Sequence, residues 1–361
     1  MDSDTLIRSR APLRLGLAGG GTDLSPYCDQ YGGAVLNVTI DRYAFASIEP
    51  SLDGRVHFQA RDLGIEESFP ANSKSISGAR LQLHAGVMQR IVSQYLGGKC
   101  PAIKISTMVD APMGSGLGSS SALVVALVEA FRTLANLPLG PYEIARIAYE
   151  VERLQLNLAG GKQDHYAAAF GGINFIEFLQ DDRVIVNPLR VQRDHFNELQ
   201  MSLITCFTGV SRRSDAIITE QQRSMKEANA ASIESLHQLK HDAVEMKRAL
   251  LAGEVSYMAD LLNRSWRAKK RTAAGISTER IEELLDYAFK QGALGAKVSG
   301  AGGGGFLMLI VDPERRFDVL KALNMAGAVA TGADFTPRGV ESWTCRRRTI
   351  SESTFYDRLT A

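Results

Sequence analysis

Residues 112–122 read Pro112-Met113-Gly114-Ser115-Gly116-Leu117-Gly118-Ser119-Ser120-Ser121-Ala122. The three glycines leave the backbone free to turn tightly and to approach a ligand closely. An apolar run from Ala122 to Ala130, without proline or glycine, follows and predicts a buried helix. A glycine-rich loop that leads into a helix N-terminus offers an anion unpaired N–H groups and a favourable dipole. The stretch therefore predicts a phosphate-binding loop, and a serine-capped turn without a ligand is the alternative.

The composition is that of a globular protein with room for about two domains. The chain has 361 residues, of which 45% are hydrophobic and 22% charged, and its formal net charge is +1. This balance argues against a nucleic-acid or membrane partner, and no apolar segment approaches the roughly 20 residues that span a bilayer. The first residues lack a signal-peptide pattern, and the scattered cysteines suggest neither zinc nor disulfides. We therefore expect a cytoplasmic protein.

Two further glycine-rich runs stand at the ends of expected strands. The first, Ala18-Gly19-Gly20-Gly21-Thr22-Asp23, follows apolar alternation over residues 6–18, which predicts a strand that carries Arg14. The second is residues 300–305, between apolar runs at 296–299 and 306–311 that also predict strands. A hairpin turn needs only about one or two glycines, so the first run favours a ligand loop.

Two common nucleotide-binding motifs are not supported. A Walker A loop needs Gly-Lys-Ser/Thr at its end, but this chain reads Gly161-Lys162-Gln163. A Rossmann pattern matches formally at Gly300-x-Gly302-x-x-Gly305, yet an apolar strand-like run follows where a helix is required. A nicotinamide-dependent oxidoreductase is therefore a distant alternative.

The remaining pattern mixes strands and helices and predicts an α+β protein. Polar residues dilute the pattern at 180–198 and predict a boundary between a first domain over 1–185 and a second over 190–361. We expect strands over 35–40, 44–48, 55–59, 102–106, 173–178, 201–207 and 339–347, and helices over 79–96, 141–156, 214–251, 254–271, 278–291 and 313–324.

Three segments together resemble the GHMP small-molecule kinases, which include galactokinase and the homoserine, mevalonate and phosphomevalonate kinases. The segments are Ala11-Pro12-Leu13-Arg14 up to Gly21-Thr22-Asp23, residues 112–122, and Lys297-Val298-Ser299-Gly300-Ala301-Gly302-Gly303-Gly304-Gly305. Within that family, residues 8–23 and the pattern Asn263-x-x-Trp266-x-x-Lys269-Lys270 resemble the D-glycero-D-manno-heptose 7-phosphate kinases. Galactokinase-like members have Gly-Glu-His-Thr-Asp where residues 19–23 stand here, which argues against galactose as the substrate.

The resemblance implies a two-domain GHMP kinase fold, with a ribosomal-protein-like N-terminal half and a ferredoxin-like C-terminal half. It implies an ATP- and Mg²⁺-dependent kinase that phosphorylates the anomeric hydroxyl of D-glycero-D-manno-heptose 7-phosphate. The product would serve the synthesis of nucleotide-activated heptose for a bacterial surface polysaccharide. ATP would lie against the loop at 112–122, which the third glycine run would brace. The expected ATP contacts are Pro112, Gly114, Gly116, Leu117, Gly118, Ser119, Ser120 and Ser121.

Asp164 and Arg14 are the expected catalytic residues. Phosphoryl transfer needs positioning, charge neutralisation and an acceptor for the hydroxyl proton. Asp164 follows a glycine pair at a helix break, which would leave its carboxylate at a loop tip. The resemblance matches Asp164 to the family's catalytic aspartate, and Arg14 to the basic residue that pairs with this aspartate or with the phosphate. The alternatives are a helix cap for Asp164 and a surface charge for Arg14.

A metal site is expected where the phosphate-binding loop enters its helix. Magnesium prefers oxygen ligands, and the Ser120 hydroxyl with a nearby carboxylate would supply them. The resemblance favours Glu152 as this carboxylate, and Glu150 stays open as the alternative. A solvated helix face would explain both glutamates equally well. We expect His165, beside Asp164, to be structural.

Short polar side chains, and backbone groups at glycines, can hydrogen-bond the hydroxyls of a polyol. Gly20, Thr22 and Asp23 are therefore the expected sugar contacts, and Gly302 from the third glycine run is placed with them at the substrate.

The substrate's own phosphate requires a basic site. Arg212 and Arg213 follow an expected strand and a glycine, as in a ligand loop, while Lys269 and Lys270 lie at helical spacing from Trp266. A solvated helix face explains the two lysines equally well. We therefore expect Arg212, Lys269 and Lys270 to hold the phosphate.

Other functions stay open at this stage. A kinase for another sugar, such as L-fucose, would carry the same motifs. A catalytically inactive sugar sensor is the alternative from another class, although the presence of both Asp164 and Arg14 argues against it. The expected partners are ATP and a small sugar phosphate, with a homodimer left open.

Overall fold

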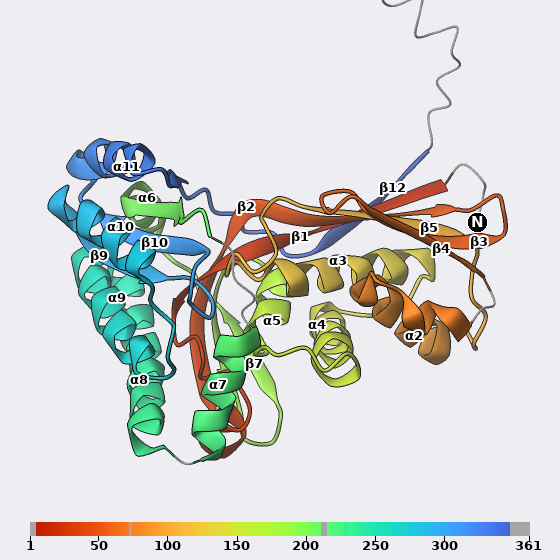
Figure 1. The fold of residues 1–361 in the computed structure, drawn as a ribbon, viewed down its shortest axis with the longest axis horizontal. Helices are drawn as coiled ribbons and strands as arrows, with labels where there is room; N and C mark the ends of the chain where they lie inside the picture. Colours follow the sequence, from red (N-terminus) through yellow and green to blue (C-terminus); the bar gives the residue numbers. More distant parts are fainter. Residues whose placement is uncertain (1–4, 72–73, 211–214, 228, 347–361) are drawn as a thin grey trace, which may run out of the picture.

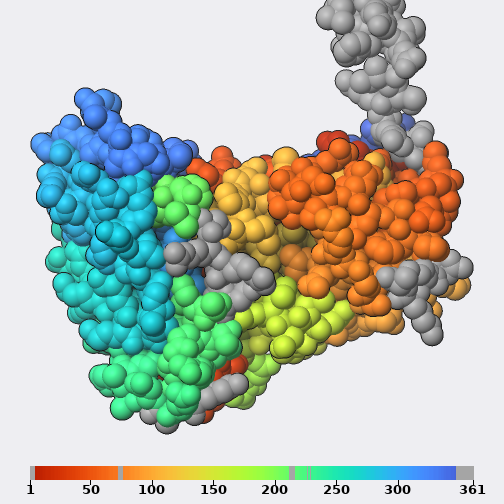
Figure 2. Space-filling model, viewed as in Figure 1, coloured from red at the N-terminus to blue at the C-terminus, as the bar shows by residue number. Residues whose placement is uncertain are grey.

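The computed structural model describes residues 5–71, 74–210, 215–227 and 229–346. It contains two β-sheets with helices packed on them, so the predicted α+β class is confirmed. Figure 1 shows the first part of the chain, in red to yellow, mostly on the right, and the green-to-blue second part mostly on the left; in Figure 2 they form adjoining lobes. Among the helices described, none is both long and apolar enough to cross a membrane.

The larger sheet has the strand order β12-β1-β2-β5-β3-β4, and β6 and β7 extend it along another part of β2. Its described pairs are antiparallel, except that β3 runs parallel to β5. The strands predicted over 35–40 and 44–48 are one strand, because Asp41 and Arg42 continue the extended backbone instead of turning. The strands are β1 (Thr5–Ala18), β2 (Gly33–Pro50), β3 (Arg55–Ala60), β4 (Ile65–Pro70), β5 (Ile103–Val109), β6 (Ile173–Phe178), β7 (Val184–Pro188) and β12 (Glu341–Arg346).

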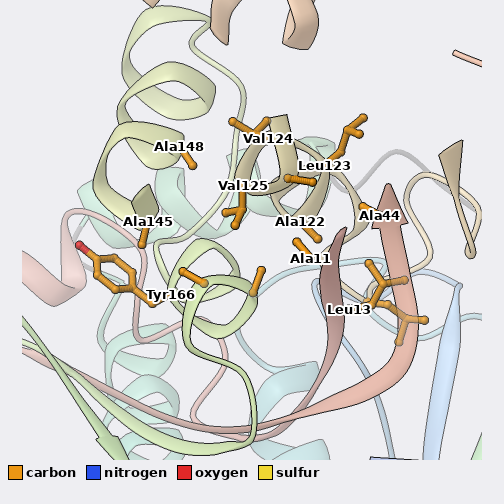
Figure 3. Packing of buried hydrophobic residues seen from close by; sticks show 14 of the residues in the cluster. Ala11, Leu13, Ala44, Ala122, Leu123, Val124, Val125, Ala145, Ala148 and Tyr166 are labelled. Carbon is orange, nitrogen blue, oxygen red and sulfur yellow. The ribbon is translucent and has the colours of Figure 1, made fainter. Parts of the chain in front are cut away.

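Helix α3 (Ser119–Leu134) lies at the centre of the helices that cover one face of this sheet (Figure 1). The predicted buried helix is confirmed as part of α3, since every residue from Ala122 to Phe131 is buried. Figure 3 shows alanine and valine side chains of α3 and α4 meeting residues of α5 and β1. Such close packing fixes the start of α3. The other helices of this part of the chain are α1 (Tyr27–Tyr31), η1 (Lys74–Gly78), α2 (Gln82–Tyr95), α4 (Pro141–Tyr149) and α5 (Gln163–Phe170), of which α2, α4 and α5 contact α3.

The helix predicted over 141–156 changes its winding halfway. It ends as α4 at Tyr149 and continues as a π-helical turn, η2 (Glu150–Gln155). π-turns inside helices often mark functional sites. Within this turn Glu152 is buried and Glu150 is half-buried, so the two open candidates for the metal ligand have different surroundings.

The smaller sheet is antiparallel and has the order β11-β8-β10-β9. The helix predicted over 214–251 is two helices, because Asn229 adopts an extended backbone and its side chain caps α8 by accepting a bond from the Ser232 N–H. The strands are β8 (Leu203–Phe207), β9 (Ala293–Val298), β10 (Phe306–Val311) and β11 (Val329–Gly332). The helices are α6 (Arg193–Ser202), α7 (Asp215–Lys226), α8 (Ala230–Ala252), α9 (Val255–Lys270), α10 (Glu279–Lys290), η3 (Pro313–Arg315) and α11 (Arg316–Met325).

The last described strand, β12, does not stay with the smaller sheet. It pairs antiparallel with β1 from Thr5 opposite Arg346 to Arg10 opposite Glu341. Just before it, the Thr39 Oγ1 donates to the Thr336 carbonyl oxygen at 2.7 Å. The predicted division into 1–185 and 190–361 remains a prediction, and the end of the second segment packs with the first.

Candidate active site

One cavity of about 480 Å³ brings the three glycine runs together. It lies at the start of α3, between the loop after β1, the segment from η2 to α5, and α9. The expected ATP contacts that are glycine or serine line this cavity. Leu117 and Pro112 do not line it, and Leu117 is fully buried in the core. The lining members of this set are Gly114, Gly116, Gly118, Ser119, Ser120 and Ser121.

The backbone of this loop requires glycine. Gly116 and Gly118 have φ angles of 80° and 74°, in the left-handed region that side chains disfavour. A Cβ on Gly116 would collide with the Ser299 carbonyl oxygen, and one on Gly300 would lie 2.6 Å from the Gly116 Cα. The third glycine run is thus packed against the first turn of the loop, as the resemblance implies. The first N–H groups of a helix have no partner within it, and among the described residues no side chain caps α3.

Arg14 and Asp164 meet at the cavity. The Arg14 Nη2 lies 2.6 Å from Asp164 Oδ1, and its Nε donates to the same oxygen at 2.7 Å. Arg14 is 4% exposed and also donates to the Gly116 carbonyl oxygen at 2.6 Å, so it is not a surface charge. The expected loop tip for Asp164 is wrong, because the residue lies in the first turn of α5. A Cβ on Gly118 would lie 3.4 Å from Asp164 Oδ2, so this oxygen adjoins the start of α3.

Glu152, and not Glu150, lies beside Ser120. The Ser120 hydroxyl donates to Glu152 Oε1 at 2.5 Å, and His165 Nε2 lies 2.7 Å from Oε2. Burial raises the pKa of the Glu152 carboxyl, but the Arg153 charge and the bonds from His165 and Ser120 outweigh it and lower the pKa to about 2. The carboxylate is therefore charged at neutral pH.

Glu150 points to a different set of partners. It pairs with Arg90 and lies 3.2 Å from the Arg146 Nε, outside the cavity. A carboxylate and a hydroxyl oxygen at Glu152 and Ser120 suit Mg²⁺. Within the described ranges, no group of three or more His, Cys, Asp or Glu could hold a metal ion. The donor set therefore fits a magnesium ion that takes most of its ligands from phosphates and water.

The expected sugar contacts divide into two kinds. Gly20 and Asp23 line the cavity. The Thr22 hydroxyl instead donates to backbone carbonyl oxygens, of Gly19 at 2.8 Å and of Ala34 at 3.0 Å, and Thr22 does not line the cavity. Burial and the neighbouring Asp164 charge raise the pKa of the Asp23 carboxyl, which accepts bonds from Gln163 and Gly21.

The two adjacent lysines of α9 also have different surroundings. Lys269 is buried, lines the cavity and donates to the Gly300 carbonyl oxygen. Lys270 points away, pairs with Glu282 at 3.1 Å and lies over the Trp266 ring, so the structure does not bring it to the site. Burial and the Arg14 charge lower the pKa of Lys269 to about 8.

One other expected substrate contact, Gly302, is not brought to the cavity by the described structure. A Cβ on Gly302 would meet Ile276 at 2.9 Å, and Gly302 is packed there and not against the cavity. Arg212 and Arg213 lie outside the described residues.

Sequence reasoning assigned no role to two other lining residues, Gln163 and Lys297. Lys297 is buried, and its Nζ donates to the carbonyl oxygens of Gly16 and Leu17 at 3.0 and 3.1 Å. Burial and the Lys269 charge lower its pKa well below the usual value. Lys297 therefore ties β9 to the end of β1. The signal in the sequence that could have pointed to Lys297 is its position just before the third glycine run.

Comparison with known proteins matches both halves of the chain to one family. Residues 82–172 match the GHMP kinases N terminal domain, and residues 246–328 match the GHMP kinases C terminal domain. A D-glycero-alpha-D-manno-heptose 7-phosphate kinase of Campylobacter jejuni is 40% identical over 93% of this chain and 98% of its own length.

Two further relatives extend the comparison. The crystal structure of a D-glycero-D-manno-heptose 1-phosphate kinase from Bacteroides thetaiotaomicron is 42% identical, has a TM-score of 0.78, and covers 93% of this chain and 98% of its own. An L-fucokinase/L-fucose-1-P guanylyltransferase of Bacteroides fragilis is 26% identical over 89% of this chain and 36% of its own length.

Sequence identity of 40% over nearly the whole of both chains is higher than two proteins that share only a fold would have. The resemblance drawn from the sequence is confirmed, and with it the class of enzyme, an ATP-dependent phosphotransferase. The chain belongs to the GHMP kinase family.

Proposed function

We propose that the enzyme transfers the terminal phosphoryl group of ATP to the anomeric hydroxyl of a D-glycero-D-manno-heptose 7-phosphate. The observation that carries the proposal is the Arg14–Asp164 pair, which lies between the start of α3 and the loop that holds Gly20 and Asp23. The segments proposed to bind the phosphates and the polyol thus line the same cavity as the Asp164 carboxylate. The heptose 7-phosphate kinase name of a relative that is 40% identical supports the choice of sugar.

Asp164 is the proposed acceptor for the proton of the attacking hydroxyl. Both Arg14 contacts go to Oδ1, while Oδ2 adjoins the start of α3. Arg14 holds the carboxylate in place and adds positive charge where negative charge develops on the transferring group. The other cavity carboxylates, Glu152 and Asp23, are each held by several hydrogen-bond donors.

Ser120 and Glu152 are the proposed magnesium ligands. A bound Mg²⁺ would neutralise charge on the phosphates of ATP during transfer. His165 lies 2.7 Å from Oε2 of Glu152 and Arg153 lies 3.3 Å from Oε1, so both oxygens of the carboxylate are held and its orientation is fixed. Gly114, Gly116, Gly118 and the start of α3 line the cavity and would bind the phosphates through backbone N–H groups.

Lys269 is the described residue that best fits a basic contact for the substrate. It lies in the cavity, and a Cβ on Gly20 would stand 4.0 Å from its Nζ, so it adjoins the loop proposed to hold the sugar. An ammonium group there would attract an acidic sugar phosphate.

The experiment is a kinase assay with ATP over heptose 7-phosphates, free heptoses, L-fucose and other sugars, with the phosphorylated position assigned by ³¹P NMR. The proposal expects the highest kcat/KM for a heptose 7-phosphate and a new phosphate on the anomeric carbon. A higher kcat/KM for L-fucose or another free sugar would contradict it.

A further inference from the structure

The Gln163 side chain has an unused hydrogen-bond acceptor at the cavity. Gln163 is 8% exposed, lines the cavity and directly precedes Asp164 in the first turn of α5. Its amide nitrogen donates to Asp23 Oδ1 at 3.0 Å, and its backbone N–H donates to Asp23 Oδ2 at 3.1 Å. Its carbonyl oxygen, Oε1, is buried and has no partner in the described structure.

The orientation of this amide follows from its neighbours. Asp23 Oδ1 also accepts the Gly21 backbone N–H at 3.1 Å, so it acts as an acceptor and requires the amide nitrogen of Gln163 to face it. Turning the amide would place two acceptors against each other. Oε1 is therefore the atom left over, and a Cβ on Gly16 would lie 3.7 Å from it. Gly16 is itself a cavity residue, and its lack of a side chain leaves space beside this oxygen.

A buried carbonyl oxygen without a partner is unfavourable relative to a bonded one, because it has lost its bonds to water without a replacement. Three charged side chains that line the same cavity already bond elsewhere: Arg14 to Asp164 and Gly116, Lys297 to Gly16 and Leu17, and Lys269 to Gly300. Within the described structure no group bonds to Oε1, so a molecule that enters the cavity can supply the donor. In a cavity for a sugar, that donor is a hydroxyl.

We infer that Gln163 is a specificity-determining residue, whose Oε1 accepts a hydrogen bond from a hydroxyl of the acceptor sugar other than the one that is phosphorylated. This rests on the proposed sugar kinase reaction at Asp164 and adds the group that selects among sugars. A site built to bond a hydroxyl rejects the analogue that lacks it, because the buried partner is then left unpaired. Asp23 and the helical turn of α5 hold the amide in place for this task.

The test pairs a change in the protein with a change in the substrate. The acceptor is the sugar that gives the highest kcat/KM with the wild-type enzyme, and its deoxy analogues lack one hydroxyl each. We expect one analogue to lose at least tenfold in kcat/KM with the wild type. In Gln163→Met, which keeps the length of the side chain and removes the acceptor, that analogue and the parent sugar should be used equally well.

Two controls separate contact from support. Gln155→Met makes the same replacement outside the cavity, where the side chain donates weakly to Gly86, and should keep the wild-type discrimination. Gln163→Glu keeps an oxygen acceptor but sets a second carboxylate against Asp23, and should therefore lower kcat/KM for every sugar by about the same factor. If Gln163→Met lowers kcat/KM for every analogue by the same factor, Gln163 only supports its neighbours and the inference is wrong.

The outcome does not depend on which sugar is preferred. A free sugar as the best acceptor would contradict the heptose 7-phosphate proposal, yet its deoxy series would still test Gln163. If Gln163→Met does not fold, Gln163→Leu replaces it, and melting temperature with ATP affinity checks each variant. Should no deoxy analogue lose more than threefold with the wild type, the inference fails without any variant.

Discussion

Arg14 and Asp164 are 150 positions apart in the chain and lie 2.6 Å apart in the structure. The pair joins the larger sheet, through β1, to the first turn of α5. Since Arg14 is almost fully buried, removal of its partner would leave an unpaired charge in the cavity, which is strongly unfavourable. The two residues should therefore respond to mutation as a unit.

Asp164→Asn should lower kcat by about 100-fold or more, because the amide keeps the shape and loses the capacity to accept a proton. ATP affinity, measured by calorimetry, should change little, since the phosphate loop is intact. The melting temperature should fall as Arg14 loses its ion pair. Turnover within about threefold of wild type, which is under 1 kcal/mol of barrier, would show that Asp164 is not catalytic.

Ser120→Ala should raise the Mg²⁺ concentration needed for half-maximal turnover more than it raises the KM for ATP. The reason is that the hydroxyl lies 2.5 Å from Glu152 Oε1 and is proposed as a metal ligand. Glu150→Gln is the matched control on the same turn, two residues from Glu152, and should leave the Mg²⁺ dependence unchanged. Identical Mg²⁺ titrations for Ser120→Ala and wild type would rule out the ligand role.

Lys269→Met and Lys270→Met form a matched pair of neighbouring replacements. The first should raise the KM for the phosphorylated sugar about tenfold, equivalent to about 1.4 kcal/mol, and the second should not. Since the pKa of Lys269 is lowered to about 8, its ammonium loses charge as the pH rises through 8. The KM of the wild type should therefore increase above pH 8, and that of Lys269→Met should not. Equal effects of the two replacements would place the phosphate contact elsewhere.

Gly116→Ala should weaken ATP binding at least tenfold, because its Cβ would collide with the Ser299 carbonyl oxygen. Gly54→Ala is the control for backbone strain, since Gly54 also has a positive φ of 73° but faces open space. Isothermal titration with ATP measures both. If both variants bind ATP like the wild type, the close contact between the loop and the third glycine run does not shape the site.

Adenine nucleotides should raise the melting temperature, by an amount that grows with the logarithm of ligand concentration over Kd. NAD should give no shift, because the Rossmann-like glycine pattern joins two strands and has no helix after it. A shift with NAD and none with ATP would contradict the assignment of the nucleotide site.

The sequence was most informative where the requirement is local. Positive φ angles at Gly116, Gly118 and Gly300 demand glycine whatever the surroundings, so the loops could be found without a structure. The buried helix could be predicted equally well from the apolar run in α3, because a helix that is buried on all sides has apolar residues on every face.

Long-range pairing explains what could not be predicted. Lys269 and Lys270 are neighbours on one helix, and which one faces the cavity depends on how α9 packs against β9. The Thr22 hydroxyl donates a hydrogen bond to the backbone carbonyl oxygen of Ala34, and no local sequence pattern indicates this partner. Gln163 meets Asp23 across 140 positions, so its role was hidden until the chain was folded.

The pairing of β12 with β1 has a consequence for the order in which the protein is made. β1 is synthesised long before β12, so the outer edge of β1 stays open until residues 341–346 have emerged. An open strand edge is a template for pairing with other chains. A chain cut short before Glu341 should therefore aggregate during expression, even though every residue that lines the cavity is present in it.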